Sequence, residues 1–183
     1  MKKHKAIRLF MVITMLILQV IFLMMTLNYN YESHNFLIVT FTLLMAVTIL
    51  WGYRYLNLHH EEHSYEKVSV AIWVPIGAFI CYSLNDYGNL GSVLAAGITG
   101  TIASFIPMMN KKSDYLKKLP AAIYCGSFVG MSSAEISPSV GFIVTAGMLT
   151  GVFFMLSKNL FLGLGGKLGS VAFLGVVVVY LLN

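Results

Sequence analysis

Long apolar runs separated by short polar segments dominate the chain. The first run, Leu9 to Leu27, follows a cationic start and is long enough for a helix to cross about 30 Å of hydrocarbon. Further apolar runs cover residues 36–51, 68–84, 90–109, 119–133, 140–156 and 168–182. The pattern predicts an all-α integral membrane protein, a polytopic helical bundle of about seven transmembrane helices.

The last run leaves the number of spans open. Gly163, Gly165 and Gly166 make a poor helix start, because glycine weakens a helix more than any residue except proline. Residues 160–168 therefore either begin the seventh span or form a cytoplasmic or re-entrant loop before a shorter span, 168–182. Six spans remain the alternative.

Composition agrees with lipid as the solvent of this chain. Hydrophobic residues make up 58% of the 183 residues, charged residues 10%, and the mean hydropathy is +0.80. A water-soluble globule of this size cannot hide so much apolar surface. The net charge of +5 comes from short clusters between apolar runs, so no solvated basic face exists, and we expect no nucleic-acid partner.

The positions of the charges predict an orientation. The loops on one side hold Glu32, Asp86 and Glu135 and no cation. All twelve Lys and Arg residues fall on the other side, in residues 1–8, 53–68, 110–118 and 158–167. The positive-inside rule then predicts a cytoplasmic N-terminus and an outer C-terminus, in a bacterial cytoplasmic membrane.

Glycine usage divides the chain into unlike parts. Of sixteen glycines, only Gly52 precedes residue 77. Small residues let helix backbones approach each other in lipid, so the later spans should pack most tightly. We predict an N-terminal transmembrane hairpin at residues 1–58, a polar cytoplasmic loop at 59–67 and a glycine-rich transmembrane bundle at 68–183.

Similar patterns recur within the bundle. Lys67, Lys118 and Lys167 lie 51 and 49 residues apart, and each begins an apolar run. A second set, Gly77, Phe79, Ser83 and Asp86, matches Gly126, Phe128, Ser132 and Glu135 at a spacing of 49. A third set, Gly91, Ala96 and Gly97, matches Gly141, Ala146 and Gly147 at a spacing of 50. These matches indicate parallel two-helix repeats. The alternative is a chance match, because Gly, Ala and Ser are common in packed membrane helices.

The segment HHEEH in the polar loop is a weak metal-site candidate. On a helix His59 and His63 would share one face, as in a two-histidine metal clamp. The order differs from HExxH, however, and no third ligand group is evident. A solvated loop is the simpler explanation of the histidines, and a response to pH is as plausible as metal binding, so we expect no bound metal and no cofactor.

Two carboxylates and one lysine are further candidates. Asp86 and Glu135 end glycine-containing spans, so they form either a vestibule that attracts cations or ordinary turn carboxylates. Lys167 follows Gly165 and Gly166, so it could hold an anion such as a phosphate or lipid headgroup near a helix start. Flanking of a span by a positive charge is the simpler explanation.

Two functions remain open, and no catalytic constellation supports an enzyme. The first is a channel or transporter that passes a small solute or ion through the bundle. Its candidate pathway and packing residues are Ser83, Asp86, Gly126, Gly130, Ser132, Glu135, Gly147, Gly151, Gly165, Gly166 and Lys167.

The second function is that of a membrane-embedded subunit, sensor or anchor. It would dock a cytoplasmic partner protein through Lys111, Lys112, Lys117 and Lys118. Besides the lipid bilayer, the expected partners are such a protein or further copies of this chain.

Overall fold

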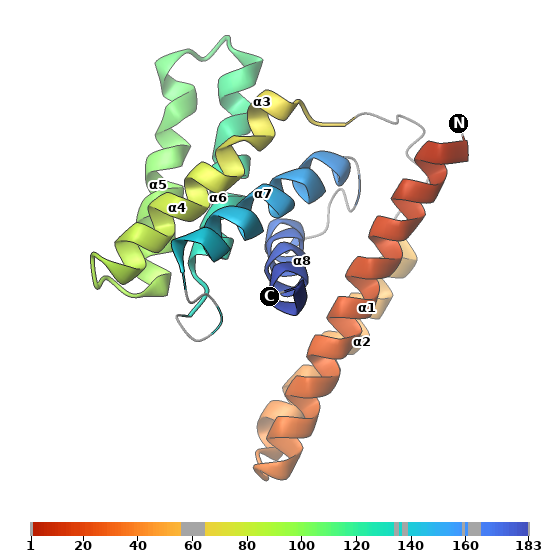
Figure 1. Ribbon diagram of the computed structural model, residues 1–183. Helices are drawn as coiled ribbons and strands as arrows, with labels where there is room; N and C mark the ends of the chain where they lie inside the picture. Colours follow the sequence, from red (N-terminus) through yellow and green to blue (C-terminus); the bar gives the residue numbers. More distant parts are fainter. Residues whose placement is uncertain are drawn as a thin grey trace. The chain divides into compact units, whose positions relative to one another are not determined.

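The computed structural model describes residues 2–55, 65–133, 136, 139–158, 160 and 166–182 (Figure 1). All regular structure in these ranges is helical, which confirms the prediction of an all-α chain. The helices are α1 (Lys2–Glu32), α2 (Phe36–Tyr55), α3 (Val68–Ala71), α4 (Trp73–Asp86), α5 (Ser92–Met109), α6 (Asp114–Gly130), α7 (Val140–Leu156) and α8 (Lys167–Leu182).

Within the described ranges, three helical stretches are long and apolar enough to cross a membrane. They are Leu9–Glu32, Val68–Asp86 and Ser92–Met109. Three more helices are apolar but shorter, at Phe36–Gly52, Val140–Leu156 and Lys167–Leu182. Length and composition thus support membrane-spanning helices in this chain.

The chain divides into two compact units, and the first contains α1 and α2. These helices pack against each other and are joined by a short turn in which His34 has a φ of 54°. Large apolar side chains are exposed along both helices, including Phe10, Met24, Phe41 and Trp51. The hairpin therefore presents an apolar surface over most of its length.

The second unit, residues 64–158 and 166–183, contains α3 to α8. Helices α4 and α6 lie side by side and make the most extensive contact (Figure 1). Helix α5 packs mainly on α6, α7 packs mainly on α4, and α8 packs on α7 and α6. Helix α6 is therefore the central element of this unit.

A single residue, Ile72, separates α3 from α4 within the predicted span 68–84. Pro75 is the reason, because it has no N–H to donate to the carbonyl of Ala71 one turn earlier. The chain continues in the same direction, so the two pieces act as one interrupted span.

Serine caps set the starts of α6 and α7. The Ser113 Oγ accepts a hydrogen bond from the Leu116 N–H at 3.4 Å, and α6 begins at Asp114, five residues before the predicted run 119–133. The Ser139 Oγ accepts from the Phe142 N–H at 3.2 Å, and α7 covers the predicted residues 140–156. Polar first-turn residues obscured the start of α6 in the sequence.

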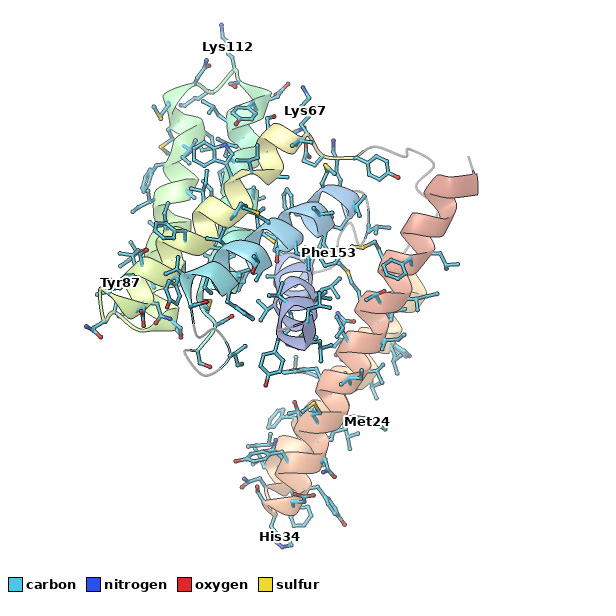
Figure 2. All side chains as sticks on the ribbon, in the orientation of Figure 1. Met24, His34, Lys67, Tyr87, Lys112 and Phe153 are labelled. Atoms are coloured by element: carbon cyan, nitrogen blue, oxygen red, sulfur yellow. The ribbon has the colours of Figure 1, made fainter. Side chains whose placement is uncertain are left out.

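The two ends of the second unit differ in charge. Figure 2 shows Lys67, which precedes α3, and Lys112, in the turn between α5 and α6, toward one end of the unit. Tyr87, which follows Asp86 at the end of α4, lies at the other end. The cationic segments thus gather on one side, as their alternation in the sequence predicts.

Candidate functional site

A buried carboxylate joins three parts of the second unit at its cationic end. Glu66 lies two residues before α3, and its side chain is only 8% exposed. Its Oε1 accepts hydrogen bonds from the Lys118 ammonium at 3.1 Å and from the Lys67 N–H at 3.2 Å. Its Oε2 lies 3.5 Å from the ammonium of Lys158, at the end of α7. We call Glu66, Lys118 and Lys158 the Glu66 cluster.

The charge of Glu66 is stabilised by its surroundings. Burial raises the pKa of Glu66, but hydrogen bonds from the Lys67 N–H and the Lys118 ammonium, together with the charge of Lys158, outweigh burial and hold the pKa below its usual range. The backbone N–H of Glu66 also donates to the Met155 carbonyl at 3.1 Å. The cluster therefore fastens the start of α3 to both α6 and α7.

Lys167 extends this group of cations to α8. Its ammonium donates to the carbonyl of Lys158 at 2.8 Å, so the first residue of α8 satisfies a carbonyl at the end of α7. A cation is favourable there because the end of a helix carries partial negative charge. Gly166 precedes Lys167 with a φ of 82°, a conformation that suits glycine.

Glycines bring the backbones of α4 and α6 into contact. A methyl group added at Gly77 would collide with the backbone of Ile123, and one at Gly126 would collide with the backbone of Val74. At Gly130 it would lie 2.5 Å from the Ala78 carbonyl oxygen. No larger residue fits these positions without moving a helix, so the sequence pair Gly126 and Gly130 lies in the closest helix contact.

The second pair of glycines lies on α7. A methyl group at Gly147 would come within 2.8 Å of the Pro75 Cα, and one at Gly151 within 3.0 Å of the Ala71 carbonyl oxygen. Pro75 has no N–H to donate to the Ala71 carbonyl. The Cα–H group of Gly151 lies toward this oxygen instead. Gly147 and Gly151 thus pack α7 against the interruption between α3 and α4.

Helix α8 approaches α7 in a similar way. The Thr150 hydroxyl is buried and, in the part of the chain that the structure describes, makes no hydrogen bond. A methyl group at Gly175 would collide with its Oγ1 atom, so the Cα–H of Gly175 points at this oxygen. A weak Cα–H···O contact compensates the hydroxyl in part. Helix α6 also contacts α8, because the Cys125 thiol of α6 donates to the Leu168 carbonyl at 3.4 Å.

Ser83 and Asp86 of the predicted carboxylate site lie in the last turn of α4, at the opposite end of the unit (Figure 2). The Ser83 hydroxyl donates to the Phe79 carbonyl of its own helix at 2.8 Å, and Asp86 is exposed. Ser132 is half-buried beyond the end of α6. Glu135 and Gly165 lie outside the described residues.

The predicted docking lysines divide into two groups. Lys111 and Lys112 are exposed in the turn before α6. Lys117 forms an exposed ion pair with Asp114 at 3.0 Å, whereas Lys118 belongs to the Glu66 cluster. The hydrogen bond from Lys117 lowers the pKa of Asp114. Only the first two lysines remain as an exposed cationic pair.

The predicted metal ligands, His59 and His63, lie outside the described residues. Among the residues that are described, no group of three His, Cys, Asp or Glu side chains is arranged to hold a metal ion.

Sequence reasoning did not identify Glu66. The polar loop drew attention to its histidines, and the acid next to Lys67 resembled an ordinary loop residue. The sequence did contain one indication of its role. Glu66 is the last acidic residue before the cation Lys67 and the apolar run that follows it. Its burial depends on Lys118 and Lys158, which are distant in the sequence.

Comparison of the chain with protein-family models, with curated proteins and with solved structures finds no match. The basis for a functional proposal is therefore the chain's own residues.

We predict that Gly126→Ala destabilises the second unit, because the methyl group meets the backbone of α4. Overpacking of this kind typically costs about 1–3 kcal/mol. Thermal unfolding of the purified protein in detergent measures the effect. The control is Gly97→Ala in α5, where a methyl group meets no atom within 4 Å. Equal stability of the two variants would contradict the close contact.

We predict that stability depends on pH through Glu66. Its pKa is lowered from 4.5 on folding, so its contribution is complete above about pH 4.5 and is lost as the pH falls through the lowered value. Glu66→Gln should cost about 1.5–3 kcal/mol at pH 7, the range for a hydrogen bond to a charged group, and less in acid.

Unfolding temperatures measured across this pH range check the prediction. Asp114→Asn is the matched control, because Asp114 also pairs with a lysine but is exposed. A loss in Glu66→Gln that is the same at pH 7 and in acid would show that the carboxylate charge is not the cause.

Proposed function

We propose that the chain is an integral membrane protein with a cytoplasmic N-terminus. Three helical stretches of sufficient length and apolarity support this proposal. So do the apolar side chains exposed along α1 and α2, which water would not tolerate over such a length. Lys and Arg residues confined to alternate loops support the orientation.

We propose further that residues 67–110 and 118–158 are two parallel repeats. The support is a reciprocal contact between α4 and α6. Gly77 meets Ile123, and Gly126 meets Val74. Gly77 and Gly126 are 49 residues apart, and so are Val74 and Ile123. When one repeat is superposed on the other, each of these two contacts therefore takes the place of the other. Two elements related by a two-fold axis are expected to behave in this way.

The pattern of burial also supports repetition. Five buried positions of α3 and α4 correspond to buried positions of α6 at the same spacing, Val70 with Leu119, Val74 with Ile123, Gly77 with Gly126, Ala78 with Ser127, and Cys81 with Gly130. The second helices of the repeats are α5 and α7. Their buried positions correspond at a spacing of 51, whereas the sequence comparison gives 50. The pairs are Ala95 with Ala146, Ala96 with Gly147, and Thr99 with Thr150.

The contacts between helices follow the same symmetry. Helix α5, second in the first repeat, packs mainly on α6 of the other repeat. Helix α7, second in the other repeat, packs mainly on α4. Helices α5 and α7 do not contact each other. A two-fold axis that runs between α4 and α6 accounts for this exchange of neighbours.

The function that this arrangement supports best is passage of a small solute or ion between the two repeats. In transporters built from repeats, the pathway lies at the repeat interface and opens when one repeat moves against the other. Here the interface is closed by the glycine contacts of α4 and α6, and the Glu66 cluster joins the repeats at the cytoplasmic end.

The Glu66 cluster carries this proposal. A carboxylate at the entrance of the first repeat binds lysines at the start and at the end of the second repeat. A buried ion pair adds little net stability to a fold, because desolvation offsets the attraction between its charges. It can, however, fix which segments lie together, because each charge of the cluster would lose its partner if the repeats separated. We therefore assign the Glu66 cluster the role of a latch.

Docking of a cytoplasmic partner is the second candidate function. The exposed pair Lys111 and Lys112 supports it. If docking is the function, charge reversal of this pair releases a co-purifying soluble protein and has no effect on permeability.

Solute passage predicts that loosening the latch raises permeability. Glu66→Gln should increase the efflux of potassium or of urea from reconstituted liposomes about tenfold, the effect of removing about 1.4 kcal/mol from the closed state. A potassium-sensitive dye and light scattering measure the two rates.

Asp114→Asn and the double variant Lys111→Gln, Lys112→Gln should behave like the wild type. Rates for wild type and Glu66→Gln that both equal those of empty liposomes would contradict solute passage.

A further inference from the structure

An apolar groove lies on the outer surface between α3, α4 and α7. It has a volume of about 300 Å³ and is lined by side chains that offer no hydrogen-bonding group, including Val68, Ile72, Pro75, Met148, Gly151 and Val152. Val68, Ile72 and Met148 are more than half exposed, so the groove opens away from the helix contacts. On the proposed membrane placement it faces lipid.

The proposed repeats differ at the position that would cover the groove. The Tyr124 ring of the second repeat covers Gly100 of the first, where an added methyl group would lie 2.8 Å from the ring. The position 49 residues before Tyr124 is Pro75, whose small ring cannot reach as far. The surface beside Gly151, which lies 51 residues after Gly100, therefore stays open.

Two lysines flank the segments that line one end of the groove. Lys67 is adjacent to Val68 and is exposed, and Lys158 follows the lining residue Met155 by three positions. The hydrogen bond from the Glu66 N–H to the Met155 carbonyl holds these segments together. Among the described residues here, Lys67 neighbours Glu66 in the sequence, and Lys118 and Lys158 pair with it, so positive charge is in excess.

We propose that this groove binds an anionic phospholipid of the bilayer. One acyl chain lies along Ile72 and Val152, and the phosphate group binds Lys67 and Lys158. An acyl chain matches a lining without donors or acceptors, and an anionic headgroup matches the excess of lysine at its end. The inference rests on the proposed membrane placement.

A lipid-retention experiment tests the proposal. The full-length protein is purified from liposomes that contain equal amounts of phosphatidylglycerol and phosphatidylcholine with the same acyl chains, and native mass spectrometry measures the lipid retained. In the wild type, the ratio of retained phosphatidylglycerol to retained phosphatidylcholine should rise by about fivefold for each lysine that binds the headgroup. The variant Lys67→Gln, Lys158→Gln should lose this preference.

Groove-filling variants test the acyl chain. Val152→Trp should abolish retention of both lipids, and Ile72→Trp is a second variant at another exposed position of the groove. The controls are Thr101→Trp, at the exposed position of α5 that corresponds to Val152, and the double variant Lys111→Gln, Lys112→Gln, which removes equal charge elsewhere on the same side. Both controls should retain phosphatidylglycerol like the wild type.

The outcomes separate the lipid site from the membrane placement. Equal retention of the two lipids by the wild type, or an equal loss in the control Lys111→Gln, Lys112→Gln, overturns the site. Retention by both groove-filling variants at the wild-type level overturns the acyl position. If the protein does not float with liposomes in a density gradient, the membrane placement itself has failed.

Discussion

The close approach of the α4 and α6 backbones is the constraint on which the rest of the second unit depends. In lipid there is little hydrophobic force between helices, so contact must come from backbone packing, which only small residues permit. Gly77, Gly126 and Gly130 provide it here. Because these helices touch along their length, α5 can pack mainly on α6 and α7 mainly on α4. A side chain in this contact would disturb both pairings.

The Glu66 cluster adds an electrostatic connection to this apolar contact. The carboxylate lies at the cationic end, where water can reach Lys118 and Lys158 in part but Glu66 hardly at all. In the proposed opening, hydration of these charges would offset part of the lost attraction, so the cluster would hold the closed arrangement with a modest free energy. The glycine contact and the ion cluster thus both connect the first helices of the unit to α6.

The sequence predicted the helices well and the site only in part. Apolar runs and glycine spacing pointed to α7 and to the pair Gly126 and Gly130, because these features depend on neighbours along the chain. The start of α6 was missed, because Ser113 caps a polar first turn. Glu66 was missed for a different reason. Its burial depends on lysines 52 and 92 residues away, and no local pattern reports such a distance.

The central claim is that lipid surrounds this chain and that the two ends of the second unit face opposite compartments. Cysteine accessibility in intact cells tests it most directly, in a background in which the buried Cys81 and Cys125 are replaced by serine. Lys112→Cys should react with a membrane-impermeant maleimide only after the cells are opened, whereas Tyr87→Cys should react in intact cells. Reaction of both positions from the same side would contradict the account.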